Sequence, residues 1–270
     1  MYPTLLKFGA FEITTFGLFM FLAFVAGGWV LAREFRRYRL DPEVASSMVV
    51  AAAVGGILGA KIYYSILFRD INLLFSRAGL VWYGGLIGGF IACSLLIRSK
   101  KINYLTAADA TVPALALGYA IGRIGCFLVG DDYGRPTDAA YGVAFPKGAP
   151  PTTAASLREF GVRLDPSLPD DTLLRVHPTQ LYETAGSLLI FAILMWLVRR
   201  PHRRGRVFAL FLMLASIERF LVEILRAKDD RFLGPFTIAQ LISVIIFTAG
   251  VALWAWTSRN EEVHPAPLPA

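Results

Sequence analysis

Charged residues are scarce in this chain. Only 17% of its 270 residues are Asp, Glu, Lys or Arg, and 56% are hydrophobic. Soluble domains carry about 25% charged residues. This balance excludes an ordinary soluble domain and predicts an integral membrane protein. The net charge of +7 does not indicate a nucleic-acid-binding protein, because the basic residues lie in short loops between apolar stretches. Cytoplasmic loops of membrane proteins carry basic residues in this way.

Cysteine and histidine are almost absent too. The two cysteines, Cys93 and Cys126, and the three histidines form no C-x-x-C motif and no zinc-ligand spacing, so neither a metal nor a cofactor is expected. The topology derived below puts the cysteines at opposite depths, and a disulfide needs Cα atoms within about 7 Å. No disulfide is therefore expected. Residues 1–10 lack a basic region and a cleavage site, so no cleavable signal peptide is expected.

Long apolar runs are frequent, by contrast. A helix needs about 20 apolar residues to cross a bilayer. Seven such runs occur, at 14–32, 45–67, 80–97, 106–128, 179–198, 207–225 and 236–256. The predicted fold class is an all-α integral membrane protein with about seven transmembrane helices. We expect one transmembrane domain over residues 1–258 and a Pro-rich, disordered cytoplasmic tail over residues 259–270.

The loop charges predict how the spans are oriented. The basic segments "REFRRYR", "RSKK" and "RRPHRRGR" follow the first, third and fifth spans, and the alternate loops are less basic. Since basic loops face the cytoplasm, the N-terminus is expected outside and the C-terminus inside. The long segment 129–178 is then external. It is rich in Pro, Gly, Asp and Thr, and a short helix is expected near residues 154–160.

Two arginines lie deep in apolar spans. A helix rises about 1.5 Å per residue, which places Arg123 about 25 Å along the fourth span, in the outer half of the membrane. Arg219 lies in the sixth span, four residues before Glu223 and therefore on the same helix face. The same depth in the outer half of the membrane is reached by Lys61, by Tyr83 and by the start of the segment "HPTQLYE". Charges at this depth are costly, so they indicate a functional site.

An anion fits this level best. Arginine binds phosphate through a planar fork that stays charged when water is removed. In the outer leaflet the simplest phosphate is a phospholipid head group, so the sequence indicates a protein that admits a lipid sideways and holds its phosphate. The alternative is a set of structural charges with snorkelling side chains, which suits Arg226 and an interfacial Tyr83.

Glycine clusters mark three of the spans. The segments "GGILGA", "GGLIGG" and "GYAIG" offer small residues at the spacing that lets helices pack closely. Close packing is the favoured interpretation. The alternative is an approach of the backbone to a lipid head group at "GGLIGG", which contains Gly84 and Gly85.

Four ordered motifs resemble the prolipoprotein diacylglyceryl transferase family. "GRIGCFLVGDDYGRPTD" resembles the signature G-R-x-G-N-F-x-N-G-E-x-x-G-x-P-T-D, and "HPTQLYE" matches H-P-[ST]-Q-L-Y-E. "ERFLVEILR" with "AKDD" resembles R-F-x-x-E-x-x-R-x-P-D, and "YGGLIGG" resembles H-G-G-L-I-G. The resemblance covers nearly the whole chain. It implies transfer of a diacylglyceryl group from phosphatidylglycerol to the lipobox cysteine of a prolipoprotein, with release of glycerol 1-phosphate, in the bacterial inner membrane.

The resemblance also implies site residues. Arg123 and Arg219 would hold the lipid phosphate and stabilise charge on the leaving group, and Glu223 would orient Arg219. The implied catalytic residues are Arg123, Arg219, Asp131 and Tyr83, and the implied substrate-binding residues are Arg123, Arg219, Gly134, Glu223, His177, Gln180, Tyr182, Lys61, Phe16, Gly84 and Gly85. The implied partners are phosphatidylglycerol, prolipoprotein signal peptides and membrane lipids, and a monomer is expected.

The chain departs from the family pattern in ways that leave its activity open. Tyr83 stands for the usual histidine, Cys126 for asparagine, Asp131 for glutamate, Phe16 for tyrosine and Lys61 for arginine. The histidine has been proposed as the base that activates the acceptor thiol. Asp131 or His177 could replace it, or the arginines could suffice by lowering the thiol pKa. Alternatively, the chain is a divergent non-catalytic paralogue. Cys126 is interpreted as a small apolar residue rather than a nucleophile.

The turn after the fourth span carries one further expectation. Gly130 and Gly134 permit non-helical turns, so the chain is expected to unwind after residue 127 and to fold back over the arginines. Asp131 would then meet Arg123, Arg219 or the incoming thiol. On this basis Asp131→Asn is expected to reduce activity more than Asp132→Asn.

Overall fold

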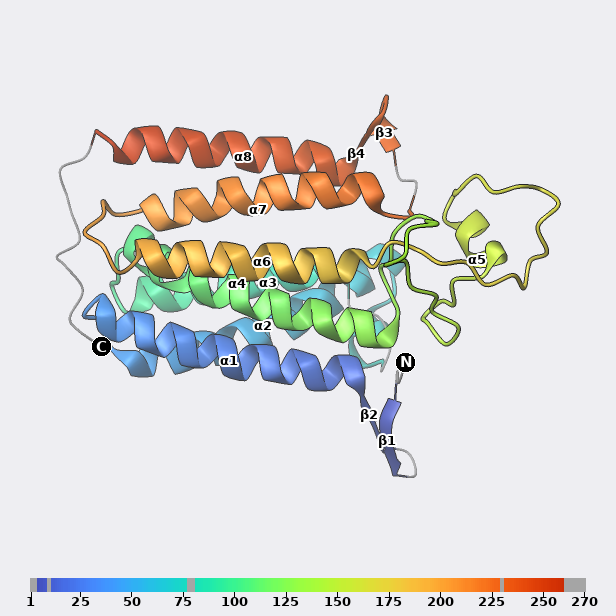
Figure 1. The fold of residues 1–270 in the computed structure, drawn as a ribbon. Helices are drawn as coiled ribbons and strands as arrows, with labels where there is room; N and C mark the ends of the chain where they lie inside the picture. Colours follow the sequence, from blue (N-terminus) through green and yellow to red (C-terminus); the bar gives the residue numbers. More distant parts are fainter. Residues whose placement is uncertain (1–3, 9–10, 77–80, 229–230, 260–270) are drawn as a thin grey trace.

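Long helices lying side by side make up most of the protein (Figure 1). The computed structural model describes residues 4–8, 11–76, 81–228 and 231–259. The long helices are α1 (Thr15–Arg37), α2 (Pro42–Phe68), α3 (Trp82–Ser99), α4 (Tyr104–Val129), α6 (Thr179–Leu197), α7 (Arg206–Leu225) and α8 (Ile238–Thr257). The shorter elements are α5 (Ala154–Glu159), the 3-10 helix η1 (Ile71–Phe75) and the strands β1 (Thr4–Phe8), β2 (Phe11–Thr14), β3 (Arg231–Leu233) and β4 (Phe236–Thr237).

Each predicted span corresponds to one of these helices, and the short helix expected in the long loop is α5. Within the described residues, α1, α2, α4, α6 and α8 are long and apolar enough to cross a membrane. The apolar stretch of α3 is shorter, and α7 carries Glu218, Arg219 and Glu223. An all-helical membrane protein is therefore confirmed. The count of seven crossings and their orientation remain predictions. Most of the expected disordered tail, residues 260–270, lies outside the described residues.

Local sequence signals set the helix ends. Asp41 accepts a hydrogen bond from the Glu43 N–H and is followed by Pro42, which suits the first helical position. Asn103 caps α4 by accepting from the N–H groups of Leu105 and Thr106. Gly130 ends α4 in the left-handed conformation, at φ +79°.

The two ends of the helix bundle differ in character. The basic loops after α1, α3 and α6 lie at one end, and the strand pairs β1–β2 and β3–β4 lie at the other (Figure 1). The segment 130–178 with α5 also projects from the strand end. All three basic loops thus share one end, as the charge pattern predicted.

The long loop between α4 and α6 has a small hydrophobic core of its own. Tyr133, Phe145, Leu157 and Val176 are at most 2% exposed, and they pack together with Ala227 beyond α7. The rings of Tyr133 and Phe145 stack with centroids 5.7 Å apart. The loop is thereby held as a folded cap over one end of the bundle.

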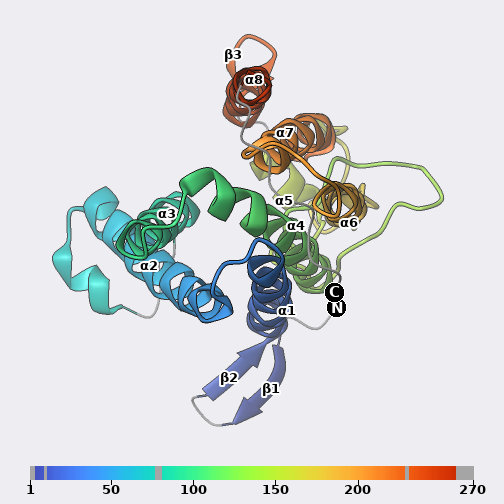
Figure 2. The same cartoon turned by 90° about the vertical axis from the view of Figure 1, so that its left-hand side faces the viewer.

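Glycines join α2 to α3. A Cβ atom added to Gly59 or Gly88 would collide with backbone of the opposite helix, and the same holds for Gly84. Gly85 faces Gly56 with ordinary contact, its ideal Cβ position lying 3.5 Å from the Gly56 carbonyl oxygen. Close helix packing is therefore the interpretation that the structure confirms for these glycines. Viewed along the bundle, the α2–α3 pair lies on one side, and α6, α7 and α8 lie on the other side of α4 (Figure 2).

Candidate functional site

A buried ion pair joins α4 to α6 near the capped end of the bundle. The Arg123 guanidinium donates through Nη2 to Glu183 Oε2, and the two residues are 8% and 1% exposed. Tyr119, one turn before Arg123, donates its hydroxyl to Glu183 Oε1 at 2.8 Å. Both oxygens of Glu183 are thus engaged, and Arg123 is fixed against α6.

Asp132 connects this pair to α7. Its Oδ2 accepts a hydrogen bond from Arg123 Nη1 at 3.0 Å, and its Oδ1 accepts from Arg226 Nη2 at 2.7 Å. The side chain of Asp132 is 45% exposed, so it lies at the rim of the charged group. Its backbone is left-handed, with φ +54°, which points the carboxylate back over the bundle.

Of the partners expected for Asp131, neither Arg123 nor Arg219 forms an ion pair with it among the described residues, and the carboxylate that meets Arg123 is that of Asp132. A contact of Asp131 with the incoming thiol stays a prediction. The helix continues to Val129, two residues beyond the expected end, and the left-handed turn at Gly130 then aims Asp131 toward Cys126. The backbone N–H of Asp131 donates to the Cys126 carbonyl at 3.2 Å. Asp131 Oδ1 is buried without a hydrogen-bond partner. The relative cost of the two Asn substitutions to activity stays a prediction.

The pKa values of the two neighbouring aspartates are shifted in opposite directions. Burial raises the pKa of Asp131, and the Asp132 charge adds to this, although the Cys126 thiol and Arg123 act against it. Burial also opposes ionisation of Asp132. Arg226 and Arg123 nevertheless outweigh burial there, and the pKa of Asp132 lies below its ordinary value. Asp132 therefore carries a firmly held negative charge beside the arginines.

The second predicted arginine lies in the same charged group. Arg219 Nη2 contacts Glu223 Oε2 at 2.5 Å, as expected from their spacing, and Arg226 Nε lies 4.0 Å from the same oxygen. The Arg219 side chain is 29% exposed. Two N–H groups, Arg219 Nη1 and Arg123 Nε, are buried without a hydrogen-bond partner. Three arginines and three carboxylates from α4, α6, α7 and the turn after α4 thus form one cluster, which we call the arginine cluster: Arg123, Arg219, Arg226, Asp132, Glu183 and Glu223.

The "HPTQLYE" segment holds the turn that carries Asp132. Thr179 donates to the Asp132 carbonyl at 2.9 Å, and Gln180 donates through Nε2 to the Asp131 carbonyl. His177 Nδ1 lies 3.2 Å from the Tyr182 hydroxyl, beside the turn. These contacts give the segment a scaffolding role, whereas substrate binding by His177, Gln180 and Tyr182, which the resemblance implies, stays a prediction.

Gly134 fits tightly between the turn and α7. Its N–H donates to the His177 carbonyl at 2.9 Å. An added Cβ would lie 2.6 Å from the Leu225 carbonyl oxygen and 2.8 Å from both His177 Cβ and Thr179 Cγ2. A side chain at this position would therefore displace the turn from α7.

The remaining predicted residues lie away from α7. Lys61, on α2, donates to the Ser76 carbonyl after η1, and Tyr83, at the start of α3, is 49% exposed. Gly84 and Gly85 face α2. Phe16, at the start of α1, is 41% exposed. Figure 2 places the α2–α3 pair across α4 from α7, so Lys61, Tyr83, Gly84 and Gly85 are not gathered around the arginine cluster. Phe16 instead lies beside α4, where its Cα is 3.8 Å from the ideal Cβ position of Gly125.

Sequence reasoning assigned no site role to three residues that the structure places here, Tyr119, Asp132 and Glu218, and it gave Glu183 only a scaffolding role within the "HPTQLYE" motif. Glu183 and Glu218 are charges inside apolar spans, which is the signal that identified Arg123 and Arg219. The partner of Arg123 is 60 residues away in the chain, and no local pattern predicts such a contact.

One group of possible metal ligands adjoins the cluster. Ligand atoms of Cys126, Asp131 and Asp132 lie within 4.8 Å of one another. Arg123 and Arg226 already neutralise Asp132, so a cation would compete with two fixed positive charges. We do not interpret this group as a metal centre.

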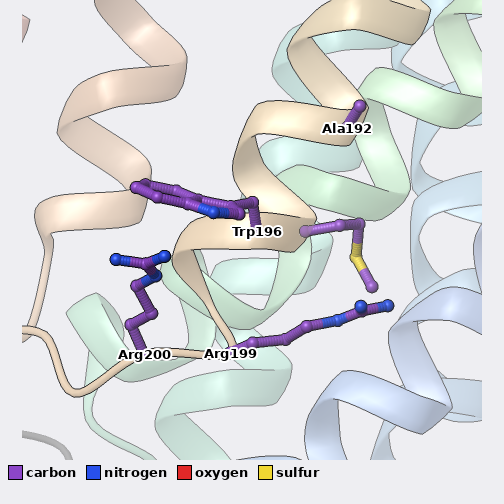
Figure 3. Close-up of a pocket in the computed structure, with 5 residues that line it drawn as sticks. Ala192, Trp196, Arg199 and Arg200 are labelled. Carbon is purple, nitrogen blue, oxygen red and sulfur yellow. The ribbon is translucent and has the colours of Figure 1, made fainter.

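A surface pocket of about 440 Å³ lies at the other end of α6, among the basic loops (Figure 3). The Arg200 guanidinium carbon lies 3.8 Å from the Trp196 ring centroid, and Arg199 extends on the other side of the pocket. A tryptophan and arginines at a helix end are typical of a membrane–water interface. The pocket is separate from the arginine cluster.

Comparison with known proteins gives one consistent result. The model of the prolipoprotein diacylglyceryl transferase family matches residues 3–256. The phosphatidylglycerol–prolipoprotein diacylglyceryl transferase of Geobacter sulfurreducens is 31% identical, over 96% of each chain. The protein of the same name from Chromohalobacter salexigens is 29% identical, over 99% of this chain and 96% of its own. That of Trichormus variabilis is 30% identical, over 99% of this chain and 92% of its own.

Proposed function

Because the chain belongs to the prolipoprotein diacylglyceryl transferase family, we propose that it transfers a diacylglyceryl group from phosphatidylglycerol to the lipobox cysteine of prolipoproteins. The relatives' names support both substrates. The products are a thioether-linked lipoprotein precursor and glycerol 1-phosphate. The multi-pass helical fold agrees with a bacterial inner-membrane enzyme.

The observation that carries this proposal is a pair of arginine N–H groups that have no hydrogen-bond acceptor. Arg123 and Arg219 come from different helices, and each keeps one buried N–H without a partner. Buried donors are usually satisfied, so each exception needs an explanation. A phosphate that enters beside Arg219, the more exposed of the two, supplies acceptors for both.

The reaction increases negative charge on the phosphate. The acceptor sulfur attacks the glyceryl carbon, a C–S bond forms, and the electron pair of the breaking C–O bond goes to the phosphate oxygen. A phosphodiester with one negative charge becomes a monoester with two. Arginines fixed by carboxylates stabilise this growing charge without reorienting, which is the role we assign to Arg123, held by Glu183, and Arg219, held by Glu223.

The cluster also explains how the two substrates meet. It lies near the end of the bundle that carries the folded loop, which we assign to the outer half of the membrane. A lipid head group in the outer leaflet and the cysteine of a membrane-inserted signal peptide both reach this level. Phosphatidylglycerol enters from the side, because its acyl chains stay in the bilayer.

The test is a reconstituted assay. The purified protein in phosphatidylglycerol vesicles is mixed with a lipobox peptide, and mass spectrometry follows the diacylglyceryl adduct. Arg219→Lys keeps the charge but loses the fork. Loss of a charge-assisted hydrogen bond, about 1.5–3 kcal/mol, predicts a rate at least about tenfold lower. Arg158→Ala is the matched control, since Arg158 pairs with Asp170 inside the loop, and full activity is expected.

Two outcomes contradict the proposal. Full activity of both Arg219→Lys and Arg219→Ala rejects the phosphate role of that residue. A wild-type protein that binds phosphatidylglycerol without forming any adduct instead supports the second candidate, a lipid-binding paralogue. The replacement of the family histidine by Tyr83 is the observation that favours this candidate.

A further inference from the structure

Transfer to a thiol needs a proton acceptor, and this requirement rests on the function proposed above. A free thiol titrates near pH 8.5, so at neutral pH it is mostly protonated. Tyr83, which replaces the family histidine, can donate and accept hydrogen bonds through its hydroxyl, but a neutral phenol is a poor base. The carboxylates of Glu183, Glu223 and Asp132 are each held by arginines. A different group has to take the thiol proton.

Glu218 is a carboxylate that takes part in none of these ion pairs. It lies on α7 directly before Arg219, and its Oε1 is buried without a hydrogen-bond partner. Its side chain lies against Gly186 of α6, where an added Cβ would be 2.9 Å from Glu218 Cγ and 3.7 Å from Oε1. Gly186 is three residues after Glu183 and therefore on the same face of α6. The two carboxylates are thus close neighbours between α6 and α7.

The charges around Glu218 come from three helices. Glu183 faces it from α6, Arg123 and the Tyr119 hydroxyl face it from α4, and Arg219 adjoins it on α7. The three arginines of the cluster are already balanced by three carboxylates. Among the described residues no arginine of the cluster forms an ion pair with Glu218, so its carboxylate is the one in this group that can take up a proton without releasing an arginine.

The depth of Glu218 suits the reacting carbon. The Arg219 guanidinium reaches the level of Glu223, whose carboxylate it contacts. Glu218 precedes Glu223 by five residues, so it lies about 7.5 Å farther from the capped end of the bundle. In a phospholipid of the outer leaflet, the glyceryl carbon lies on the acyl-chain side of the phosphate. A phosphate bound at Arg219 and Arg123 would therefore direct this carbon toward Glu218.

We propose that Glu218 is a further catalytic residue, the general base that accepts the proton of the lipobox thiol. As the sulfur attacks the glyceryl carbon, its proton passes to the Glu218 carboxylate. The C–S bond forms, and the electron pair of the C–O bond goes to the phosphate. Glu218 loses its negative charge while the phosphate gains one, so the total charge of the site does not change. In a site of low dielectric constant, this avoids the cost of creating a new net charge.

Asp131 and His177 are the competing bases. His177 is hydrogen-bonded to the Tyr182 hydroxyl beside the turn, which leaves Asp131 as the stronger competitor. Its Oδ1 is also buried without a hydrogen-bond partner, but its carboxylate is turned toward Cys126. It belongs to the turn after α4 and lies beyond the capped end of that helix. The experiment includes it as a separate variant.

The test uses two acceptor peptides that differ only in the reacting atom, a lipobox cysteine or a selenocysteine. A selenol is already ionised at neutral pH and needs no base. With the cysteine peptide at pH 7, Glu218→Gln is expected to be about 100-fold slower than wild type or more, and its rate should rise with pH as the thiol ionises. With the selenocysteine peptide, the same variant should recover to within severalfold of wild type. Its thermal unfolding temperature should not fall, because a carboxylate without a cationic partner is removed.

The control is Glu223→Gln, which releases Arg219 rather than removing the base. It should be slow with both peptides. The assignment of Glu218 is overturned if Glu218→Gln keeps wild-type activity, if it is equally slow with both peptides, or if Asp131→Asn is the variant that the selenocysteine peptide rescues. A wild-type protein inactive with both peptides rejects the proposed transferase function, and the role of Glu218 with it.

Discussion

The Arg123 guanidinium and the Glu183 carboxylate form a buried ion pair between residues 60 positions apart. The pair connects α4 to α6 and sets the direction of the guanidinium, whose Nη1 then reaches Asp132. On the proposed function, Glu183 would affect catalysis through the position of Arg123, while Arg123 itself would meet the phosphate. Stability and activity should separate when both partners are replaced together, but not when only one is removed.

Removing one partner should be costly for both properties. Glu183→Gln leaves Arg123 buried with reduced compensation, and breaking a buried pair in this way costs about 3–5 kcal/mol. The unfolding temperature in detergent is expected to fall markedly. The triple variant Tyr119→Phe/Arg123→Leu/Glu183→Leu removes the charges and the hydroxyl together, so its unfolding temperature should return close to that of wild type, while transfer activity is abolished. A triple variant that keeps transferring would show that Arg123 has no part in the chemistry.

The adjacent aspartates should affect stability in opposite directions. Burial raises the pKa of Asp131 in the folded protein. The ionised carboxylate therefore destabilises the fold when the pH is above this raised pKa. The destabilisation disappears when the pH is below the pKa of the unfolded chain, about 3.9, because Asp131 is then protonated in both states. Asp131→Asn should therefore raise the unfolding temperature at pH 7 and leave it unchanged near pH 3.

Asp132 has a lowered pKa, so its ion pairs stabilise the fold above about pH 4 and are lost as the pH falls through the lowered value. Asp132→Asn should lower the unfolding temperature at pH 7, and the difference from wild type should shrink in acid. Thermal unfolding of both variants between pH 3 and pH 8 checks these signs. Shifts of the same sign at pH 7 would contradict the arrangement of the turn.

Two glycines provide a matched comparison of packing. Gly134→Ala puts a methyl group against the Leu225 carbonyl and His177, and overpacking of this kind costs about 1–3 kcal/mol. Gly122→Ala meets no atom within 4 Å, and alanine is favoured over glycine in a helix by about 0.5–1 kcal/mol. Gly134→Ala should lower the unfolding temperature, and Gly122→Ala should leave it unchanged or raise it. The reverse order would mean that the turn does not pack on α7 as described.

The orientation of the bundle can be tested by labelling. Glu159, on α5, and Ser99, at the end of α3, are both exposed and lie at opposite ends. In a background without Cys93 and Cys126, Glu159→Cys should react with an impermeant maleimide in spheroplasts. Ser99→Cys should react only after lysis. The opposite pattern would place the arginine cluster in the inner leaflet.

The sequence predicts the helices well because membrane spans depend on a local property, the length of an apolar run. It underestimates their ends where charged residues continue a helix into the interface, as in α1, which extends to Arg37 instead of residue 32. The short hairpins were not predicted, since residues 4–8 and 11–14 carry too weak a pattern.

The candidate site is only partly visible in the sequence. Arg123 and Arg219 are identified by their cost at membrane depth, and the spacing of Arg219 and Glu223 predicts their contact. The choice between Asp131 and Asp132 depends on a left-handed turn at Gly130, whose exact start the sequence does not give. The partnership of Arg123 with Glu183 depends on how α4 packs against α6, which is a property of the whole fold.

The glycine contact between α2 and α3 limits how this helix pair can move. Since Gly59 and Gly88 touch the opposite backbone, sliding either helix by one residue would drive a side chain into that backbone. The two helices are locked in register and can shift only as a single rigid body. This contact is flanked by Lys61 on α2 and Tyr83 on α3. The distance between these two residues therefore stays fixed, whatever lipid or peptide lies beside them.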